Sequence, residues 1–354
     1  MTNLHAPIAP SADGHTAVSS APEENALGRL WALGDYVTPL ALRMISDLGV
    51  ADALTDGPLP VSELAGRTGA HPDALRRAMR VLVAQQVFEE PSLGVFALNE
   101  TSQPLRSDHP LSARDAFSLL SCDLHAWAEA AHSMRTGEPA FEHVHGTTRW
   151  KYLDEHPEDA ERFHRRMRSA SRQWGTLLAS CYPWAGDEDV VDVGGGTGGV
   201  LAELLHVFPG MRGHLLDQPS VVEAAPTVLS AHNPEVADRC TVTGGDFFTA
   251  VPSGHGTYLL VNVLHDWDDD HALRILMTVR AAMRDDSTLL IVEGGVTEQA
   301  GSASGPLDLH MLVVWGGRER TRPEWNTLLS RSGLAVERVL PASPRHIVVV
   351  RPAA

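Results

Sequence analysis

The chain has 354 residues, 43% hydrophobic and 21% charged, which is ordinary for a globular protein long enough for two domains. Its formal net charge of −17 disfavours nucleic acid as a partner, because nucleic-acid-binding proteins normally carry a basic face. The three cysteines form no zinc or redox pattern, and no segment reaches the roughly 18 apolar residues of a membrane span. We therefore expect a cytoplasmic protein that does not bind membranes.

The beginning of the chain predicts a disordered lead and then a helix. Residues 1–24 are rich in Ala, Ser, Pro and His and lack an apolar core segment, so they resemble neither a signal peptide nor a folded element. Residues 26–54 carry Leu, Trp, Ile and Val at helical spacing.

Residues 25–110 predict a winged-helix-like domain. A short helix at 61–65, a turn and a second helix at 71–86 precede a β-ribbon within 87–98. Two interpretations remain open. The second helix carries arginines that could bind DNA, or the module serves dimerisation, which the acidic composition favours.

Residues 111–185 predict a mainly helical region. It is rich in large side chains that could either line a pocket for an aromatic substrate or pack in a core: Trp127, Phe141, Trp150, Phe163, Met167 and Trp174. We expect Trp127, Phe141 and Met167 to contact the substrate.

Residues 186–354 predict an α/β fold, a Rossmann-like doubly wound sheet, because strands and helices alternate. The expected strands are 189–193, 212–217, 240–243, 257–263 and 287–293, and the expected helices between them are 198–207, 219–230 and 268–284. After two further helices, the segments 334–340 and 346–350 predict a C-terminal antiparallel hairpin.

A glycine-rich turn follows the first strand of this domain. Gly194, Gly196 and Gly199 allow the backbone to turn sharply and approach a ligand, as in many nucleotide-binding enzymes. Asp192 ends the strand, and its carboxylate would repel a pyrophosphate but suits a ligand with an ammonium and a sulfonium. The turn therefore favours adenosylmethionine over a nicotinamide or flavin cofactor.

Two more acids follow later strands. Asp217 ends the second strand and can accept hydrogen bonds from both ribose hydroxyls of an adenosine ligand, or else cap the next helix. Asp246 follows the third strand and could bind the adenine amino group while Phe247 covers the ring, or the two could form a plain turn.

His265 lies at the end of the fourth strand, at the sheet edge where ligands bind in open α/β folds. A histidine there, with acids available to orient it, is typical of a general base. A metal site of His265, Asp266, Asp268 and His271 is the alternative, but an aspartate before a helix more simply caps it. We expect no metal.

Four motifs occur in order: DVGGGTG (192–198), GDFF (245–248), LHDW (264–267) and ERT (319–321). With them the chain, from about residue 26 to 352, resembles the adenosylmethionine-dependent small-molecule O-methyltransferases that act on plant phenolics and tailor actinobacterial antibiotics. The resemblance implies a homodimer, S-adenosylmethionine as methyl donor, S-adenosylhomocysteine as product and a small aromatic hydroxylated acceptor.

The resemblance also implies roles for single residues. Gly194 and its turn would hold the amino-acid part of the cofactor, whose carboxylate Ser171 would reach. His265 matches the family's base, with Glu293 and Glu319 beside it. Residues expected to contact the acceptor are Met167, Asp266 and His310.

Other functions remain open at this point. The same turn occurs in nicotinamide oxidoreductases, and a winged helix on a ligand-binding sheet could be a transcription regulator. Within the family, a carbon or nitrogen acceptor is an alternative to oxygen, and a tailoring enzyme on the same fold that transfers no methyl group is another.

Overall fold

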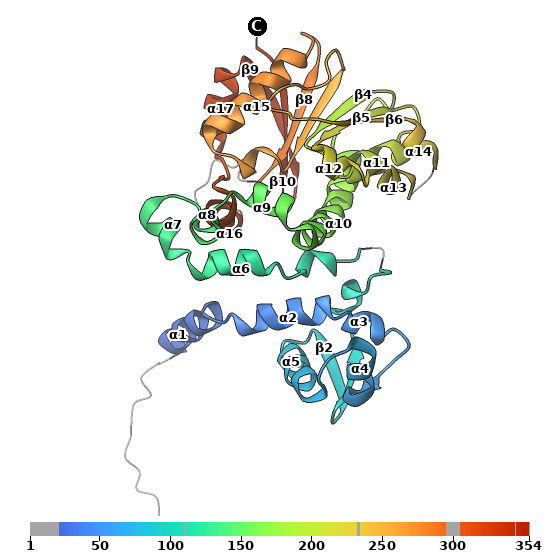
Figure 1. The fold of residues 1–354 in the computed structure, drawn as a ribbon, viewed down its shortest axis with the longest axis vertical. Coiled ribbons are helices and arrows are strands. Elements are labelled where there is room, and N and C mark those ends of the chain that lie inside the picture. The colour runs from blue at the N-terminus through green and yellow to red at the C-terminus, as the bar shows by residue number, and fades with distance from the viewer. Residues whose placement is uncertain (1–20, 110, 232–233, 295–304, 344, 354) are drawn as a thin grey trace, which may run out of the picture.

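The computed structural model describes residues 21–109, 111–231, 234–294, 305–343 and 345–353 (Figure 1). The predicted lead, residues 1–24, lies mostly outside them, and helix α1 (Ala21–Leu33) already begins within it. Among the described helices, none is long and apolar enough to cross a membrane.

The predicted helical segment 26–54 is divided in the structure. Helix α1 is followed by α2 (Val37–Asp47) and α3 (Val50–Ala53). Gly49 separates the last two with a left-handed φ of 66°, a conformation that glycine adopts without strain.

The winged-helix elements lie as predicted. They are α4 (Val61–Thr68), α5 (Pro72–Ala84), β2 (Phe88–Ser92) and β3 (Val95–Leu98), with a short strand β1 (Leu59–Pro60) pairing with β3. The arginines of α5 are paired with carboxylates of the same domain, Arg77 with Asp73 at 2.7 Å and Arg80 with Glu90 at 2.8 Å. This pairing neutralises much of the face that DNA binding would need.

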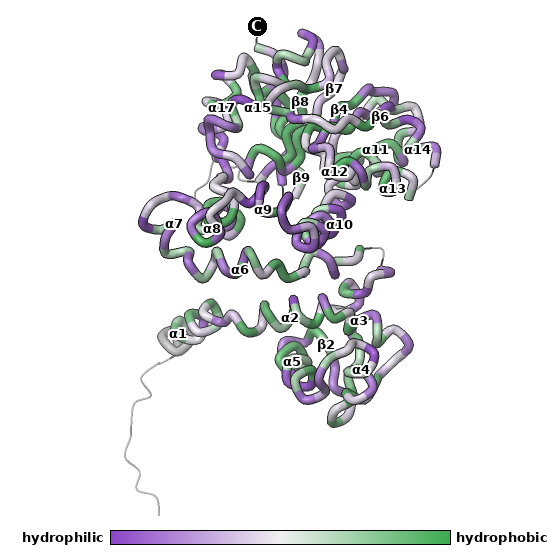
Figure 2. Tube along the Cα trace, in the orientation of Figure 1, coloured by the Kyte–Doolittle hydropathy of each residue, from purple (hydrophilic) through white to green (hydrophobic). Residues whose placement is uncertain are grey.

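A helical region connects the two ends of the molecule and lies between them in Figure 1. It consists of α6 (Ser121–Ala128), α7 (Ala131–Thr136), α8 (Ala140–His145), α9 (Arg149–Glu155) and the long helix α10 (Pro157–Cys181). Figure 2 shows α10 as mostly hydrophilic, in contrast to the hydrophobic strands of the sheet above it.

The C-terminal domain is built on a sheet of order β6-β5-β4-β7-β8-β10-β9. The strands are β4 (Asp189–Val193), β5 (Arg212–Asp217), β6 (Cys240–Gly244), β7 (Thr257–Val261), β8 (Thr288–Glu293), β9 (Leu334–Ala342) and β10 (Arg345–Pro352). Strands β4 to β8 run parallel, and β9 and β10 form the predicted antiparallel hairpin. The Rossmann-like fold class is confirmed.

Helices cover both faces of this sheet. Buried residues of α15 (Asp269–Ala282) and α17 (Arg322–Arg331) form one core with the sheet. Residues of α10, α11 (Gly199–Val207) and α13 (Ala225–Ser230) form the other. Two short helices complete the domain, α14 (Pro234–Asp238) and α16 (Gly305–His310), the latter continued by a π-helical turn at Met311–Trp315.

One helix prediction is wrong. The expected helix 219–230 is divided into α12 (Pro219–Val222) and α13. Pro226 has no N–H to donate to the carbonyl of Val222, and its ring would clash with that carbonyl in a continuous helix.

Candidate active site

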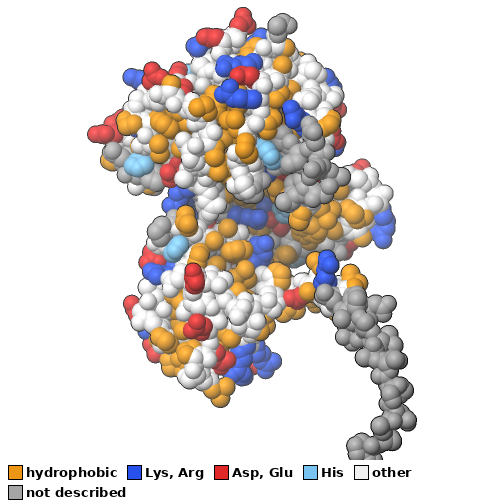
Figure 3. Space-filling model, turned by 180° about the vertical axis from the view of Figure 1, so that it is seen from behind, with side chains coloured by type: hydrophobic (Ala, Val, Ile, Leu, Met, Phe, Trp, Pro, Cys, Tyr) orange, Lys and Arg blue, Asp and Glu red, His pale blue; other side chains and the backbone are white. Residues whose placement is uncertain are grey.

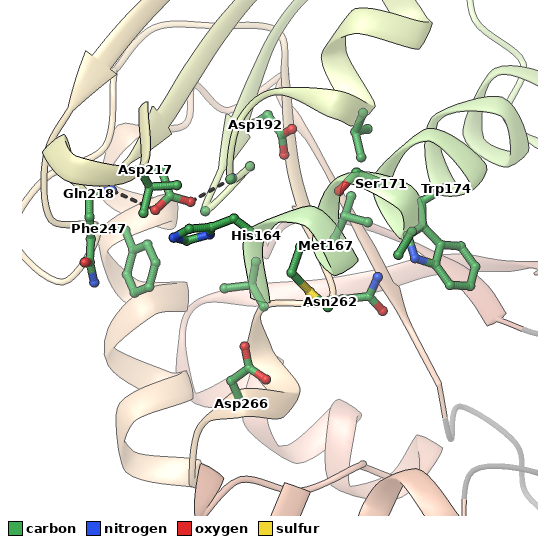
Figure 4. A pocket seen from close by; sticks show the side chains of 18 of the residues that line it. His164, Met167, Ser171, Trp174, Asp192, Asp217, Gln218, Phe247, Asn262 and Asp266 are labelled. Atoms are coloured by element: carbon green, nitrogen blue, oxygen red, sulfur yellow. Dashed lines mark hydrogen bonds between the residues drawn. The ribbon is translucent and has the colours of Figure 1, made fainter. Parts of the chain in front are cut away.

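A pocket with about 900 Å³ of empty space lies at the carboxyl ends of β4, β5 and β7, with α10 as its opposite wall (Figure 4). Of the residues predicted from sequence, the pocket is lined by Met167, Ser171, Asp192, Gly194, Gly196, Asp217, Phe247 and Asp266. The aromatic side chains Trp150, Phe163, Trp174 and Trp267 also line it.

Sequence reasoning missed three polar residues of this wall: His164, Gln218 and Asn262. His164 stands three residues before Met167 and seven before Ser171, so helical periodicity could have found it. Gln218 directly follows a strand end. The sequence holds no comparable signal for Asn262, a non-glycine residue with a positive φ of 53°.

The glycine turn has the geometry that the sequence predicts. Gly194, Gly196 and Gly198 have φ values of 71°, 62° and 86°, all left-handed. A Cβ on Gly194 would lie 3.0 Å from Val263 and 3.4 Å from the ring of Phe247. A Cβ on Gly199 would lie 2.8 Å from that of Ser171, which shows how closely α10 approaches the turn. Side chains at these positions would therefore fill the space beside the glycine turn that a ligand would occupy.

Asp192 is fully buried beneath this turn, and neither of its carboxylate oxygens has a hydrogen-bond partner among the described residues. Burial and the nearby charge of Asp217 raise its pKa to about 7. An unpartnered buried carboxylate is costly, so the site favours a ligand that brings a cation or several donors.

Asp217 is fixed by the neighbouring backbone. Its oxygens accept hydrogen bonds from the N–H groups of Gly196 and Gln218, both at 2.7 Å, as drawn in Figure 4. Burial raises its pKa, and these two hydrogen bonds oppose the rise. The carboxylate oxygens retain lone pairs for ligand hydroxyls, because each can accept more than one hydrogen bond.

Asp246 differs from expectation. It is exposed, it is not part of the pocket wall, and its oxygens accept hydrogen bonds from the N–H of Phe248 (2.9 Å) and the hydroxyl of Thr249 (3.1 Å). It holds the turn that presents Phe247 to the pocket.

His265 is buried in a short helical turn after β7 and is surrounded by acids, two of which lie near its Nδ1. This nitrogen lies 2.8 Å from Oε1 of Glu319, with hydrogen-bond geometry, and 3.1 Å from Oε2 of Glu293, without it. Glu293 instead accepts from the backbone N–H groups of Val263, Leu264 and His265 through Oε1. Glu293 therefore holds the turn, and Glu319 orients the ring.

The other ring nitrogen lies beside a residue of the pocket wall, although His265, Glu293 and Glu319 are not themselves among the residues that line the pocket. Nε2 of His265 lies 3.5 Å from Oδ1 of Asp266, which lines the pocket directly. Burial alone would lower the pKa of the imidazole, but the charge of Glu293 and the hydrogen bond to Glu319 outweigh it and raise the pKa to about 9. Burial raises the pKa of Asp266 to about 7, and His265 opposes that rise.

The alternative metal set is not assembled. His265 is buried, whereas Asp268 and His271 form an exposed pair, and Asp268 caps α15 by accepting the N–H of His271 at 2.8 Å. His265, Glu293 and Glu319 do place possible ligand atoms within 4.8 Å of one another. However, Glu319 also accepts a hydrogen bond from Arg345 at 3.3 Å, and Glu293 accepts hydrogen bonds from backbone N–H groups. The two glutamates are therefore better suited to orienting the imidazole than to binding a metal ion.

Three predicted acceptor contacts lie elsewhere. Phe141 is fully buried, packs against Tyr152 and Arg149 in a core cluster, and is not among the residues that line the pocket. Trp127 and His310 line a second cavity and not the one at the glycine turn. The sequence marked Trp127 and Phe141 as large side chains of a helical region, and His310 through the resemblance, but neither signal tells which helices face one another.

Comparison with known proteins identifies the family. Residues 127–335 match an O-methyltransferase domain, and residues 31–108 match an O-methyltransferase dimerisation domain. The chain belongs to the O-methyltransferases. This methyltransferase uses S-adenosylmethionine, the cofactor that the resemblance implied.

Individual relatives agree with this assignment. The mitomycin biosynthesis 6-O-methyltransferase of Streptomyces lavendulae is 40% identical, over 88% of this chain and 90% of its own. A phenazine O-methyltransferase of Lysobacter antibioticus is also 40% identical, over 90% and 94%. A neocarzinostatin-biosynthesis O-methyltransferase, solved with S-adenosylmethionine and 2-hydroxy-5-methyl naphthoic acid, superposes with a TM-score of 0.78 at 35% identity and covers 91% of this chain and 98% of its own.

The pocket of this methyltransferase fits its cofactor. The carboxylate of Asp192, which has no donor among the described residues, suits a cationic ligand, and the glycine cradle leaves room for the ligand beside the backbone. A nicotinamide pyrophosphate would instead meet the carboxylates of the buried Asp192 and the half-buried Asp217.

Proposed function

We propose that the enzyme methylates a hydroxyl of a small aromatic secondary metabolite, of phenolic or polyketide-like type, with His265 as general base. The observation that supports this proposal is the imidazole of His265, which is held by Glu319 and lies 3.5 Å from Asp266, a residue of the aromatic pocket that Asp192 and Asp217 also line. Relatives named for mitomycin biosynthesis and phenazine, and one solved with a naphthoic acid, support an aromatic acceptor.

The cofactor would be held by residues of the strand ends. Asp192 and the glycine turn would bind its ammonium end, with Ser171 at its carboxylate, and Asp217 would accept from the ribose hydroxyls. Phe247, presented by the turn that Asp246 holds, would cover the adenine. When bound, S-adenosylmethionine supplies an electrophilic methyl group on sulfur.

His265 would accept the proton of the acceptor hydroxyl at Nε2 while the oxygen attacks. A phenol has a pKa of about 10 and an ordinary histidine about 6.5, so this transfer is normally uphill by several pKa units. Glu293 and Glu319 raise the imidazole pKa to about 9, which removes most of that difference. Glu319 then stabilises the imidazolium through the Nδ1 hydrogen bond.

This arrangement predicts a particular pH dependence. A general base acts only in its neutral form, so the rate of methyl transfer should rise with pH as His265 loses its proton. In the wild type, the midpoint of this rise in the pH–rate profile should lie near pH 9. Glu319→Gln removes one of the negative charges that hold the proton on His265, so the midpoint of the rise should move to lower pH. Initial rates from pH 6 to 10 with one acceptor test this.

The control for this profile is Asp268→Asn, which changes an exposed cap outside the His265 cluster. The pH–rate profile of this variant should rise at the same pH as that of the wild type. If the rate of Glu319→Gln rises at the same pH as that of the wild type, the orienting role of Glu319 is contradicted.

A homodimer is also part of the proposal. The dimerisation domain exposes large apolar side chains along α1 and α2, among them Trp31, Leu33 and Val37, with Trp31 75% exposed. Such a row of apolar side chains is typical of a protein interface. Light scattering should give the mass of two chains, and the mass of one chain would contradict this part of the proposal.

A further inference from the structure

A second cavity, with about 880 Å³ of empty space, lies between α2, α6, α10 and α16. Its walls include Arg43, Asp123, Trp127, Arg166 and His310. Arg166 directly precedes Met167 on α10, which lines the cofactor pocket. Basic side chains are visible in the hollow between the two ends of the molecule in Figure 3.

The charges on this cavity wall do not balance. Among the described residues, Asp123 is the one acid that lines it, and Asp123 is already paired with the buried Arg149 at 3.1 Å. Arg43 and Arg166 are half-buried, and neither has an ion pair or hydrogen bond within the described part of the chain. Burial lowers the pKa of Arg166, the charge of Asp123 opposes this shift, and the nearby Arg43 and Arg149 act in the same direction as burial.

His310 adds a neutral donor to the same wall. Its Nδ1 lies 3.2 Å from Nε1 of Trp127, whose N–H donates to it, so the ring proton of neutral His310 is on Nε2. Burial, with Arg166, Arg149 and Arg43 nearby, lowers the pKa of His310 to about 3, so the ring remains neutral. The wall thus offers two unpaired guanidinium groups and an N–H donor.

We propose that Arg43, Arg166 and His310 form a carboxylate subsite, and that the acceptor is an aromatic hydroxy acid. This inference rests on the proposed function and deepens it. Two guanidinium groups without a partner, in a protein of net charge −17, fit an anionic group better than a neutral phenol. Arginine binds carboxylates through paired hydrogen bonds that fix orientation as well as position.

The position of the subsite suits a specificity role. Arg166 and Met167 are adjacent on α10 and line the second cavity and the cofactor pocket respectively, and the charge of His265 contributes to the lowered pKa of His310. A carboxylate held by Arg166 would therefore anchor a ring near the imidazole and Met167, and would select which hydroxyl reaches Nε2. A neutral acceptor would leave both guanidinium groups unpaired.

The test uses hydroxynaphthoate isomers, each compared with the naphthol that lacks the carboxyl group. Calorimetry in the presence of S-adenosylhomocysteine gives the Kd of each for the full-length wild type, Arg43→Met and Arg166→Met. We expect at least one hydroxynaphthoate to bind the wild type tenfold or more tightly than its naphthol, and each substitution to remove most of that preference. Arg165→Met, on the exposed side of α10, is the matched control and should keep it.

Binding of S-adenosylhomocysteine to each variant shows that it is folded and separates the two proposals. If the wild type and variants bind S-adenosylhomocysteine but no hydroxynaphthoate is preferred over its naphthol, the subsite proposal is wrong and the methyltransferase proposal stands. A preference that survives both Arg43→Met and Arg166→Met would also overturn the subsite. Failure of the wild type to bind S-adenosylhomocysteine would contradict the proposed function itself.

Discussion

Replacing His265 by alanine is expected to lower kcat by about 10²–10⁴, the usual contribution of a general base, while leaving the affinity for S-adenosylhomocysteine nearly unchanged. The imidazole is oriented by Glu319 at 2.8 Å, and its other nitrogen lies 3.5 Å from Asp266, which lines the pocket away from the glycine turn. Its removal therefore acts on the acceptor proton and not on the cofactor. Single-turnover methyl transfer and calorimetry measure the two effects separately.

His271→Ala provides the matched control, because His271 follows closely in the chain but is exposed and paired with Asp268. It should leave kcat within a factor of about two of the wild type, as expected for a surface substitution. Unchanged turnover in His265→Ala would remove this residue from the chemistry. A large loss of S-adenosylhomocysteine affinity would instead assign His265 to cofactor binding.

Replacing Asp192 by asparagine is expected to weaken S-adenosylmethionine binding and to stabilise the cofactor-free protein. Removing one partner of a buried charge pair costs roughly 2–5 kcal/mol, so affinity should fall by about 30-fold or more. Calorimetric titration measures this loss. Asp217, which is held by two backbone N–H groups, remains in place in the variant.

The stability effect follows from the sign of the pKa shift. Burial raises the pKa of Asp192 from its ordinary value to about 7. A carboxyl group whose folded pKa is raised is destabilising when ionised, so the cost is absent below about pH 4, grows as pH rises through the folded pKa, and is complete above it. Asparagine removes the charge, and the free energy of unfolding at pH 8 should rise by roughly 1–3 kcal/mol.

Denaturant titrations at pH 8 and pH 4 test this prediction, and Asp187→Asn at an exposed position just before β4 is the control. The gain of Asp192→Asn should be present at pH 8 and small at pH 4. A loss of stability at pH 8 would show that a partner holds the Asp192 carboxylate in the cofactor-free protein.

The strands and the glycine turn could be predicted nearly residue by residue. Strands β4 and β5 match their predicted bounds, because each contains a short apolar run with an aspartate at or next to its last position. His265 and its two glutamates, more than 25 residues apart in sequence, meet as the resemblance implied. Which glutamate orients the ring depends on hydrogen-bond geometry, and the sequence carries no signal for it.

The pocket wall on the helical side was harder to predict. Phe141, Trp127 and Met167 look alike in sequence, each a large side chain at helical spacing, yet one lies in a core, one in the second cavity and one in the cofactor pocket. Their places depend on the packing of α6, α8 and α10 against one another. Arg43 and Arg166 stand more than 100 residues apart, and only the fold brings them to one cavity.

A crystal structure of the ternary complex would test the central claim most directly. The complex should contain S-adenosylhomocysteine and an acceptor that the enzyme methylates in an activity assay. The account predicts the acceptor hydroxyl within about 2.6–3.2 Å of Nε2 of His265, the reach that proton abstraction requires. It also predicts the amino group of the cofactor product at Asp192. A hydroxyl bound out of reach of this imidazole, with no water between them, would contradict the account.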